Sequence, residues 1–207
     1  MSIPHPASSR NRMSSCERRE AIVEAAVQLF ARNGFRGTTT REIAQAVGVS
    51  EPVLYVHFQT KRDLYSAIIE RMAKGSGPGA CRPAASDGEF FLNLAEDILA
   101  WHIEDPTRIR LLLFSALEGH ELSELFYERH FLPFLEALSG YIAGRIEDGE
   151  FRQLDPMIAA RAFCGMIGQF GQANTVFRKE WNEPERKKIV SEMVNIFLSG
   201  MRKPEGR

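Results

Sequence analysis

The sequence predicts an all-α protein, with an N-terminal three-helix helix-turn-helix domain followed by a larger helical domain, about nine helices in all. Apolar residues recur at helical spacing along most of the 207 residues. Residues that favour helix starts precede several of these segments, and glycine or proline stands where many of them stop. We expect three parts: a disordered arm over 1–15, the helix-turn-helix domain over 16–60 and the helical domain over 61–207.

The first helix is expected over residues 17–33. Its apolar residues fall on one face, and Gly34 follows as a residue that can end a helix. Phe35 then turns toward the interior. That face consists of Ile22, Ala25, Ala26, Leu29 and Phe30.

A second and a third helix follow, separated by a turn of three residues. Thr39 and Glu42 have the spacing of a capping box, so a helix begins directly after Thr39. Gly48 can adopt the left-handed conformation that ends this helix. Ser50 is a second N-cap and Pro52 falls in the next first turn, where its missing N–H costs no hydrogen bond.

Two helices around such a turn are typical of the DNA-binding helix-turn-helix, whose second helix enters the major groove. Leu54 and Phe58, one helical turn apart, supply the inward face of this reading helix over 51–57. The remaining side chains are expected to face outward or to meet DNA. These candidates are Thr40, Arg41, Glu51, Pro52, Val53, Tyr55, His57 and Lys61.

Several candidates have a second explanation that needs no DNA. Arg41 can donate two hydrogen bonds to guanine, although exposed arginines are often only solvated. Lys61 opposes the helix dipole at a helix start, which favours a phosphate partner. Thr40 suits either a phosphate or extra capping. Glu51 is better explained as a favourable first-turn acid than as a cytosine contact.

The pattern G-x-T-T-x-x-I-A-x-x-x-G-V-S-x-x-x-L-Y-x-H-F-x-x-K, over residues 37–61, resembles the N-terminal domain of TetR-type transcriptional regulators. The resemblance implies a regulator, usually a repressor, in which Tyr55 and His57 contact phosphates and base edges. Without DNA, Tyr55 would pack between helices and His57 would be plain surface. Many members have glycine where this chain has Pro52, whereas the founding tetracycline repressor resembles this chain in its proline.

The charge is divided unevenly along the chain. Residues 1–62 contain nine lysines and arginines against five acids, a net +4, and the rest contains 17 against 22, a net −5. A basic N-terminal part on an acidic body favours polyanion binding at one end only. The arm over 1–15 has no apolar period and is expected to stay disordered until phosphate is near; it and the first helix contribute Arg10, Arg12, Arg18 and Arg19.

The rest of the chain is predicted to be helical apart from one linker. Apolar periodicity and Asp-Pro or Glu-Pro starts define the segments. We expect helices over 61–74, 87–104, 106–117, 121–147 with a kink at Pro133, 155–178, and 183–198 closed by Gly200, with the linker over 75–86.

The last two helices are apolar on more sides than one subunit can bury, so we expect a homodimer. Small residues on one helix would let a partner helix approach, and apolar rows widen the face of the other. The alternative is a bundle closed within one chain. A dimer places two reading helices on one side of a palindromic operator. The interface candidates are Ala162, Gly165, Gly168, Ile189, Met193, Ile196 and Phe197.

Aromatic residues are plentiful between the dimer helices and the helix-turn-helix. In most helical bundles they are simply core, yet with nearby histidines they could line an apolar cavity for a small molecule. The resemblance implies such an effector, and this composition suits an apolar or aromatic one. The candidates are Phe91, Trp101, His102, Phe114, Tyr127, His130, Phe134, Met166 and Phe170. Effector binding is expected to shift the helix over 61–74 and change the separation of the two reading helices.

Other classes of protein fit poorly. The segment HELSE lacks the second histidine of a zinc helix, and neither G-x-S-x-G nor a phosphate loop occurs, so we expect no enzyme, metal or cofactor. A sequence-blind DNA-coating protein would be basic throughout, and a ligand-responsive activator stays possible. Neither a signal peptide nor a membrane span is found, and three cysteines without C-x-x-C spacing indicate the cytoplasm.

Overall fold

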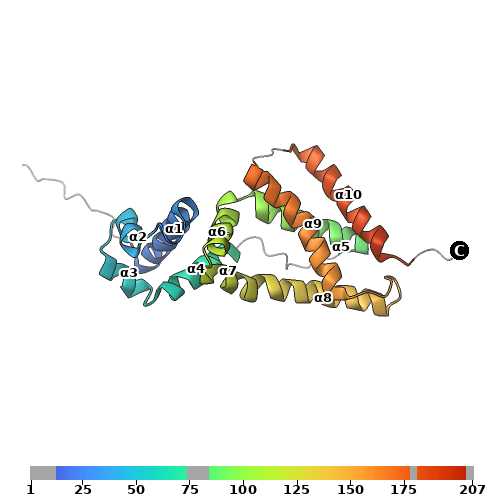
Figure 1. Ribbon diagram of the computed structural model, residues 1–207, viewed down its shortest axis with the longest axis horizontal. Coiled ribbons are helices and arrows are strands. Elements are labelled where there is room, and N and C mark those ends of the chain that lie inside the picture. The colour runs from blue at the N-terminus through green and yellow to red at the C-terminus, as the bar shows by residue number, and fades with distance from the viewer. Residues whose placement is uncertain (1–12, 74–83, 178–180, 204–207) are drawn as a thin grey trace, which may run out of the picture.

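The computed structural model describes residues 13–73, 84–177 and 181–203 and confirms the all-α prediction. Figure 1 shows an elongated molecule with a three-helix head at one end and a larger helical body at the other. The head contains α1 (Ser15–Asn33), α2 (Thr40–Val47) and α3 (Glu51–His57), and α4 (Lys61–Ala73) leads out of it. The body contains α5 (Asp87–Ile103), α6 (Pro106–Leu117), α7 (Glu121–Phe126), η1 (Tyr127–Phe131), α8 (Leu132–Glu147), α9 (Pro156–Phe177) and α10 (Glu183–Met201).

α7, η1 and α8 form one unbroken helix, so the described residues make nine helical rods. The rod widens to a π-helical turn at η1, and Pro133, where we predicted a kink, lies in the first turn of α8 directly after it. Proline donates no backbone hydrogen bond and crowds the carbonyl four residues before it. The wide turn, in which the Leu132 N–H donates to the Tyr127 carbonyl, relieves this crowding within the rod.

α1 starts at Ser15, two residues before the predicted start. Ser14 is its N-cap: the Glu17 N–H donates to Ser14 Oγ over 3.2 Å, and the Ser14 N–H donates to the Glu17 carboxylate over 2.7 Å. Residues 13–15 therefore belong to the head and not to the predicted disordered arm. Residues 1–12 of that arm lie outside the described residues, as do residues 74–83, which hold most of the predicted linker, and Arg178.

The end of α10 also differs from the prediction. The helix continues through Gly200 to Met201 instead of stopping at Leu198. Gly200 is not among the glycines with positive φ, so it gives the helix no left-handed stop. Arg202 ends the helix in an extended conformation and forms an isolated β-bridge with Phe151. The Arg152 N–H donates to the Met201 carbonyl over 2.8 Å, so the end of α10 is tied to the loop after α8.

Two hydrophobic cores hold the molecule together. The first extends from the head into α4, α6 and α7, so these three helices share buried side chains with the head. The second lies among α5, α8, α9 and α10. Fully buried members of the first include Ile22, Ile43, Leu54, Phe58, Ile68, Leu111 and Leu122, and those of the second include Phe91, Leu135, Ile142, Phe163 and Ile167.

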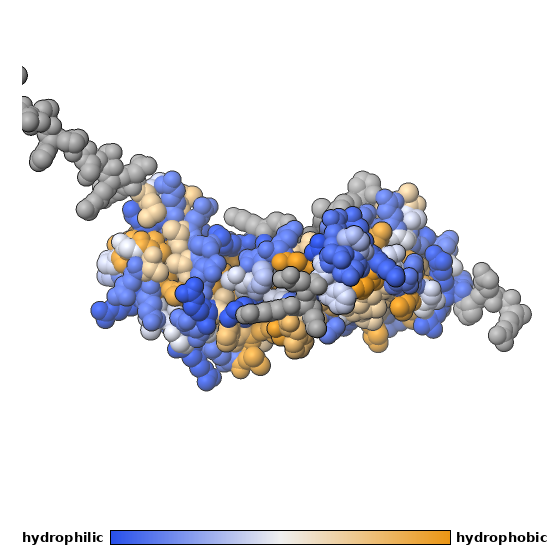
Figure 2. All heavy atoms as spheres, turned by 90° about the horizontal axis from the view of Figure 1, so that it is seen from above, coloured by the Kyte–Doolittle hydropathy of each residue, from blue (hydrophilic) through white to orange (hydrophobic). Residues whose placement is uncertain are grey.

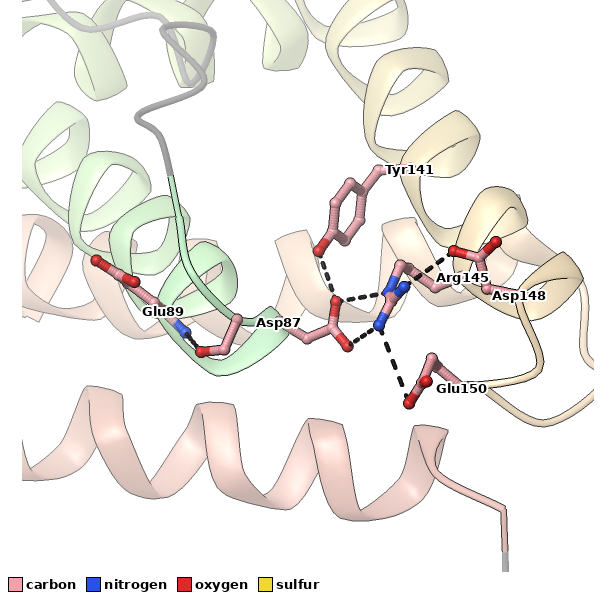
Figure 3. Close-up of polar contacts among 7 residues, drawn as sticks. Asp87, Glu89, Tyr141, Arg145, Asp148 and Glu150 are labelled. Atoms are coloured by element: carbon pink, nitrogen blue, oxygen red, sulfur yellow. Dashed lines mark hydrogen bonds and ion pairs between the residues drawn. The ribbon is translucent and has the colours of Figure 1, made fainter.

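A polar cluster fixes the start of α5 against the end of α8 (Figure 3). The Asp87 carboxylate accepts hydrogen bonds from the Tyr141 hydroxyl at 2.6 Å and from two nitrogens of Arg145 at 2.8 and 3.0 Å. Arg145 also pairs with Asp148 at 2.9 Å. Burial alone would raise the pKa of Asp87, but the hydrogen bonds from Arg145 and Tyr141 outweigh it and hold the pKa below its ordinary value of 3.8.

Replacing Arg145 with methionine should lower the free energy of unfolding by about 1.5–3 kcal/mol at neutral pH, because it leaves the Asp87 carboxylate without its charged donor. A lowered pKa contributes stability above the ordinary pKa, and this is lost as the pH falls through the folded-state value. The difference between wild type and variant in urea unfolding should therefore shrink toward about pH 3.

The control is Lys187→Met, which removes a solvent-exposed pair with Glu183 and should leave the free energy of unfolding almost unchanged. An equal loss in the two variants would contradict the stabilising effect of the Asp87 cluster.

Candidate nucleic-acid interface and internal cavity

The turn between α2 and α3 has the predicted geometry. Thr39 and Glu42 form the capping box, with the Thr39 N–H donating to the Glu42 carboxylate over 2.7 Å. Gly48 is left-handed, at φ 75° and ψ 30°, and its N–H reaches the carbonyls of α2. Ser50 holds the N-cap position of α3, although its side chain makes no cap hydrogen bond. The two helices are therefore fixed at a tight corner.

α3 turns one face into the head and the opposite face outward. Leu54 and Phe58 are each only 1% exposed, whereas Tyr55 is 40% and Val56 is 79% exposed. Pro52 is exposed as well. Val56 was not predicted as a contact, although its position two residues after Leu54 puts it on the opposite side of a helix. An exposed valine here adds an apolar surface that can meet a thymine methyl group.

Thr40 was predicted to face outward and is instead buried. Its hydroxyl donates to the Glu51 carboxylate at the start of α3, so these two side chains join α2 to α3. Glu51 is half-buried, and its interaction with Thr40 explains its place better than a cytosine contact. Of the other candidates, Val53 and His57 are half-buried.

Positive side chains lie beside α3. Arg41 on α2 and Lys61 at the first position of α4 are both exposed. Thr60 and Asp63 cap α4, with the Thr60 N–H donating to Asp63 over 2.8 Å, so the helix start is stabilised despite Lys61. Arg19, which was assigned to the basic N-terminal region, lies 4.8 Å above the Phe58 ring.

The Glu118 carboxylate, at the end of α6, accepts hydrogen bonds from the turn between α1 and α2. Glu118 Oε2 accepts from the backbone N–H groups of Phe35, at 3.0 Å, and Arg36, at 2.9 Å. Gly34 has φ 74°, and a Cβ there would collide with the Glu118 carboxylate. We call this contact the α6 clasp; it joins the head to the body directly, besides the connection through α4.

Aromatic rings pack behind the α6 clasp. The His120 ring stacks on Phe35 with centroids 3.9 Å apart and meets Tyr65 edge-on at 4.4 Å. The Leu122 N–H donates to His120 Nδ1 over 3.2 Å, so His120 also caps α7. Burial lowers the pKa of His120 and therefore favours the neutral ring that this cap requires.

The body contains a cavity of about 650 Å³ that is partly open to solvent. Its walls come from the end of α4 and from α5, α6, α7, η1, α8 and α9, and they are mostly apolar. Five of the predicted effector residues line it, namely Trp101, His102, Tyr127, His130 and Phe134. The wall also contains residues that were not predicted, among them Leu112, Leu113, Arg161 and Cys164.

Four predicted effector residues lie elsewhere. Phe91 is fully buried and contacts Phe163 and Phe197 in the second core. Met166 and Phe170 pack against the same core, and Phe114 does not line the cavity. Helical periodicity in the sequence predicts that these side chains face inward. It does not distinguish those that pack in the core from those that line the cavity.

Two polar contacts involve residues that line the cavity. The Trp101 indole N–H donates to the Met72 carbonyl in the last turn of α4 over 3.4 Å. Arg161 Nη2 donates to the Tyr127 hydroxyl over 2.8 Å. Cys164 on α9 is buried and also lines the cavity, and burial raises the pKa of its thiol to about 12. This thiol is therefore a poor candidate for thiolate chemistry at neutral pH.

The predicted dimer residues divide into two groups. Ala162 and Gly165 on α9 are exposed, as is Ile196 on α10 at 66%, while Ile189 and Met193 are half-buried. Gly168 instead faces His102 of the same chain, since an added Cβ would lie 3.6 Å from that ring. Phe197 contacts Phe91 and Phe163 at centroid distances of 5.0 and 4.9 Å, so it belongs to the second core.

Apolar surface remains on the body. Figure 2 shows hydrophobic side chains along the lower edge of the view near its middle, and a further group in the head. On α9 the exposed residues Ile158, Ala162, Gly165 and Val176 recur at helical spacing. With Ile196 of α10 they form what we call the α9–α10 face. A second subunit is the simplest cover for such a face.

The described residues contain no group of three or more histidine, cysteine or acidic side chains placed to hold a metal ion. None of the described helices has both the length and the apolar composition of a membrane span.

Two parts of the chain match known families. Residues 22–68 match the family described as bacterial regulatory proteins, tetR family. Residues 105–200 match the AefR-like transcriptional repressor, C-terminal domain. The two matches fall on the helix-turn-helix end and on the cavity-bearing body.

Similar proteins include nucleoid occlusion factor SlmA of Marinobacter nauticus, 30% identical over 140 residues, which are 66% of this chain and 70% of SlmA. The transcriptional activator FasR of Mycolicibacterium smegmatis is 43% identical over 61 residues, and the class C tetracycline repressor of Escherichia coli is 44% identical over 54 residues. The FasR match covers 30% of this chain and 28% of FasR, and the repressor match covers 26% of this chain and 25% of the repressor.

Solved structures share the fold over nearly the whole chain. A TetR family regulator from Pseudomonas syringae has a TM-score of 0.75 at 24% identity, covering 92% of this chain and 100% of that one. AibR in complex with isovaleryl coenzyme A and operator DNA has a TM-score of 0.64 at 22% identity, covering 87% and 97%.

Proposed function

The chain belongs to the TetR family of DNA-binding transcriptional regulators, and from that premise we propose that it is a homodimeric repressor released from its operator by a small molecule. Residues 16–60 would bind DNA and residues 61–207 would bind the effector and the second subunit. The observation that carries the proposal is the position of the cavity: α4 and α6 line it and also share a core with the head.

The outward face of α3 supports sequence-specific DNA binding in the major groove. Pro52, Tyr55 and Val56 are exposed there without a packing function in the head. Arg41 and Lys61 flank them with positive charge for guanine or phosphate. Pairing two subunits through the α9–α10 face would present two such surfaces to half-sites about 34–36 Å apart.

The path from cavity to head supports release by an effector. Four residues of α6 line the cavity, and Glu118, just after α6, holds the turn between α1 and α2. Trp101 lines the cavity and binds the last turn of α4. A ligand that moves either wall would change the placement of the head, and a coupling of about 1–3 kcal/mol gives a 5- to 150-fold drop in operator affinity.

Repression is favoured over activation because the match over 105–200 is to a repressor domain. The names of FasR and SlmA include activation and nucleoid occlusion, so operator binding alone does not separate these outcomes. A cytoplasmic site of action follows from the proposed operator.

The decisive experiment titrates the full-length protein against its own upstream DNA and a scrambled duplex at several salt concentrations. We expect tighter binding to the upstream DNA at every salt concentration, by about a thousandfold or more. Equal affinities with a steep salt dependence would instead indicate sequence-blind binding.

Two variants separate base contacts from phosphate contacts in that assay. Lys61→Ala should weaken binding to both duplexes and reduce the slope of log affinity against log salt by about one. Arg41→Ala should cost about 1–3 kcal/mol on the operator and little on the scrambled duplex. Lys187→Ala, in the first turns of α10 and outside the head, is the control and should leave both affinities unchanged. Identical behaviour of all three variants would refute the assigned contacts.

A further inference from the structure

The charge of the cavity wall restricts what can bind in it. Of the described residues that line the cavity, Arg161 is the only one with a permanent charge, and none is aspartate or glutamate. An organic cation would lose hydration against the mostly apolar wall without gaining a carboxylate. An anion could instead pair with the guanidinium of Arg161. The wall therefore discriminates by charge as well as by shape.

Arg161 and Tyr127, both exposed at the open side of the cavity, present several donors at one place. Arg161 Nη2 donates to the Tyr127 hydroxyl, which leaves the hydroxyl hydrogen free to point elsewhere. In the part of the chain that the structure describes, no acidic side chain forms a salt bridge with Arg161. A guanidinium beside a phenolic O–H matches the acceptor oxygens of a carboxylate.

His102 offers the opposite hydrogen-bonding character. Its Nδ1 lies 2.7 Å from the Ile98 carbonyl, which can only accept, so Nδ1 carries the hydrogen. Burial lowers the pKa of His102 and favours the neutral ring. Nε2 then has a free lone pair, and no described residue donates to it. A ligand hydroxyl could donate there.

The two sites are separated along α9. His102 lies against Gly168, where an added Cβ would be 3.6 Å from Nε2. Arg161 is seven residues earlier, which is about 10 Å along a helix. The wall between them is largely apolar and includes Leu112, Leu113 and Phe134.

We propose that the cavity binds an elongated carboxylic acid that carries a hydroxyl group about 10 Å from its carboxylate, across an aromatic or aliphatic body. The carboxylate accepts from Arg161 and Tyr127, and the hydroxyl donates to His102 Nε2. This inference rests on the proposed function, since it specifies the effector of the same cavity.

The test uses calorimetry on the full-length protein with rigid probes that differ in one group. The reference probe is para-hydroxycinnamate, which has a hydroxyl and a carboxylate at opposite ends. Cinnamate lacks the hydroxyl, para-methoxycinnamate replaces the donor with an acceptor, para-hydroxycinnamide removes the charge, and cinnamylamine reverses it. We expect losses of about tenfold for the methoxy ether and about fivefold for the amide, with the amine weakest.

A variant tests whether Arg161 binds the carboxylate of the ligand. Arg161→Met should reduce binding of para-hydroxycinnamate about fivefold and leave para-hydroxycinnamide unchanged. Arg110→Met replaces an exposed arginine of α6 that does not line the cavity, and should change neither affinity.

Three results would overturn the proposal: the amine binds as tightly as the acid, the methoxy ether binds as tightly as the phenol, or no probe binds. The operator titration described above, run without ligand, tests the DNA-binding function separately. Specific operator binding with any of these three results would reject the ligand class alone.

Discussion

Leu54→Ala is expected to abolish specific operator binding and to lower the free energy of unfolding by about 2–5 kcal/mol. α3 has only seven residues, too few to persist as a helix without packing. Leu54 is its one buried residue, and the neighbouring Phe58 completes the anchor. Shortening the Leu54 side chain would leave a cavity beneath α3. The helix and its outward-facing residues would then no longer be held in one orientation.

Val56→Ala is the matched control, because it removes an exposed apolar side chain from the same helix. Urea unfolding should distinguish the two variants, with Val56→Ala within about 0.5 kcal/mol of wild type. Its operator affinity should fall slightly, and only for duplexes that keep the thymine whose methyl group Val56 meets. If Leu54→Ala binds the operator normally, α3 is not the reading helix.

Glu118→Ala should uncouple effector binding from operator binding. The α6 clasp is the contact through which α6, a wall of the cavity, holds the turn between α1 and α2. Without the carboxylate, two backbone N–H groups lose their acceptor and the head loses about 1.5–3 kcal/mol of stabilisation. An effector that lowers wild-type operator affinity 5- to 150-fold should then lower that of the variant only a few-fold.

The measurement is operator affinity with and without effector, for wild type, Glu118→Ala and the control Glu124→Ala. Glu124 is an exposed acid on α7, so its removal changes the charge equally without touching the α6 clasp. Effector affinity, measured without DNA, should be the same in all three proteins. A Glu118→Ala variant with the full wild-type response would place the coupling in α4 alone.

Helix caps and helix ends could be predicted from the sequence where residues within one turn determine them. The capping box at Thr39 and the left-handed Gly48 depend on residues within one turn, and both are confirmed. The same S-x-x-E signal was present at Ser14 and was missed, so the first helix was placed two residues late. Gly200 looked like a helix stop, but the stop is set by the bridge to Phe151, far away in sequence.

The errors at the site come from contacts between separate elements. Thr40 looked exposed because its partner, Glu51, lies on the next helix. Gly168 looked like a place for another subunit, whereas its small size admits the His102 ring of its own chain. Phe91 and Trp101 have similar spacing and hydrophobicity, yet only Trp101 lines the cavity, because the arrangement of α5 against α9 divides them.

The π-helical turn at η1 allows single-residue changes of length inside the long rod. Such a turn holds one residue more than an α-helical turn, so deleting one residue from it would restore regular α geometry on both sides. Because both kinds of turn complete one revolution, the helix before the deletion would keep its rotation relative to the helix after it, and only the side chains within the turn would change direction. Tyr127 and His130 would then present different atoms to the bound molecule. A lineage could exchange one chemical signal for another in this way while α1, α2 and α3 keep their amino-acid sequence.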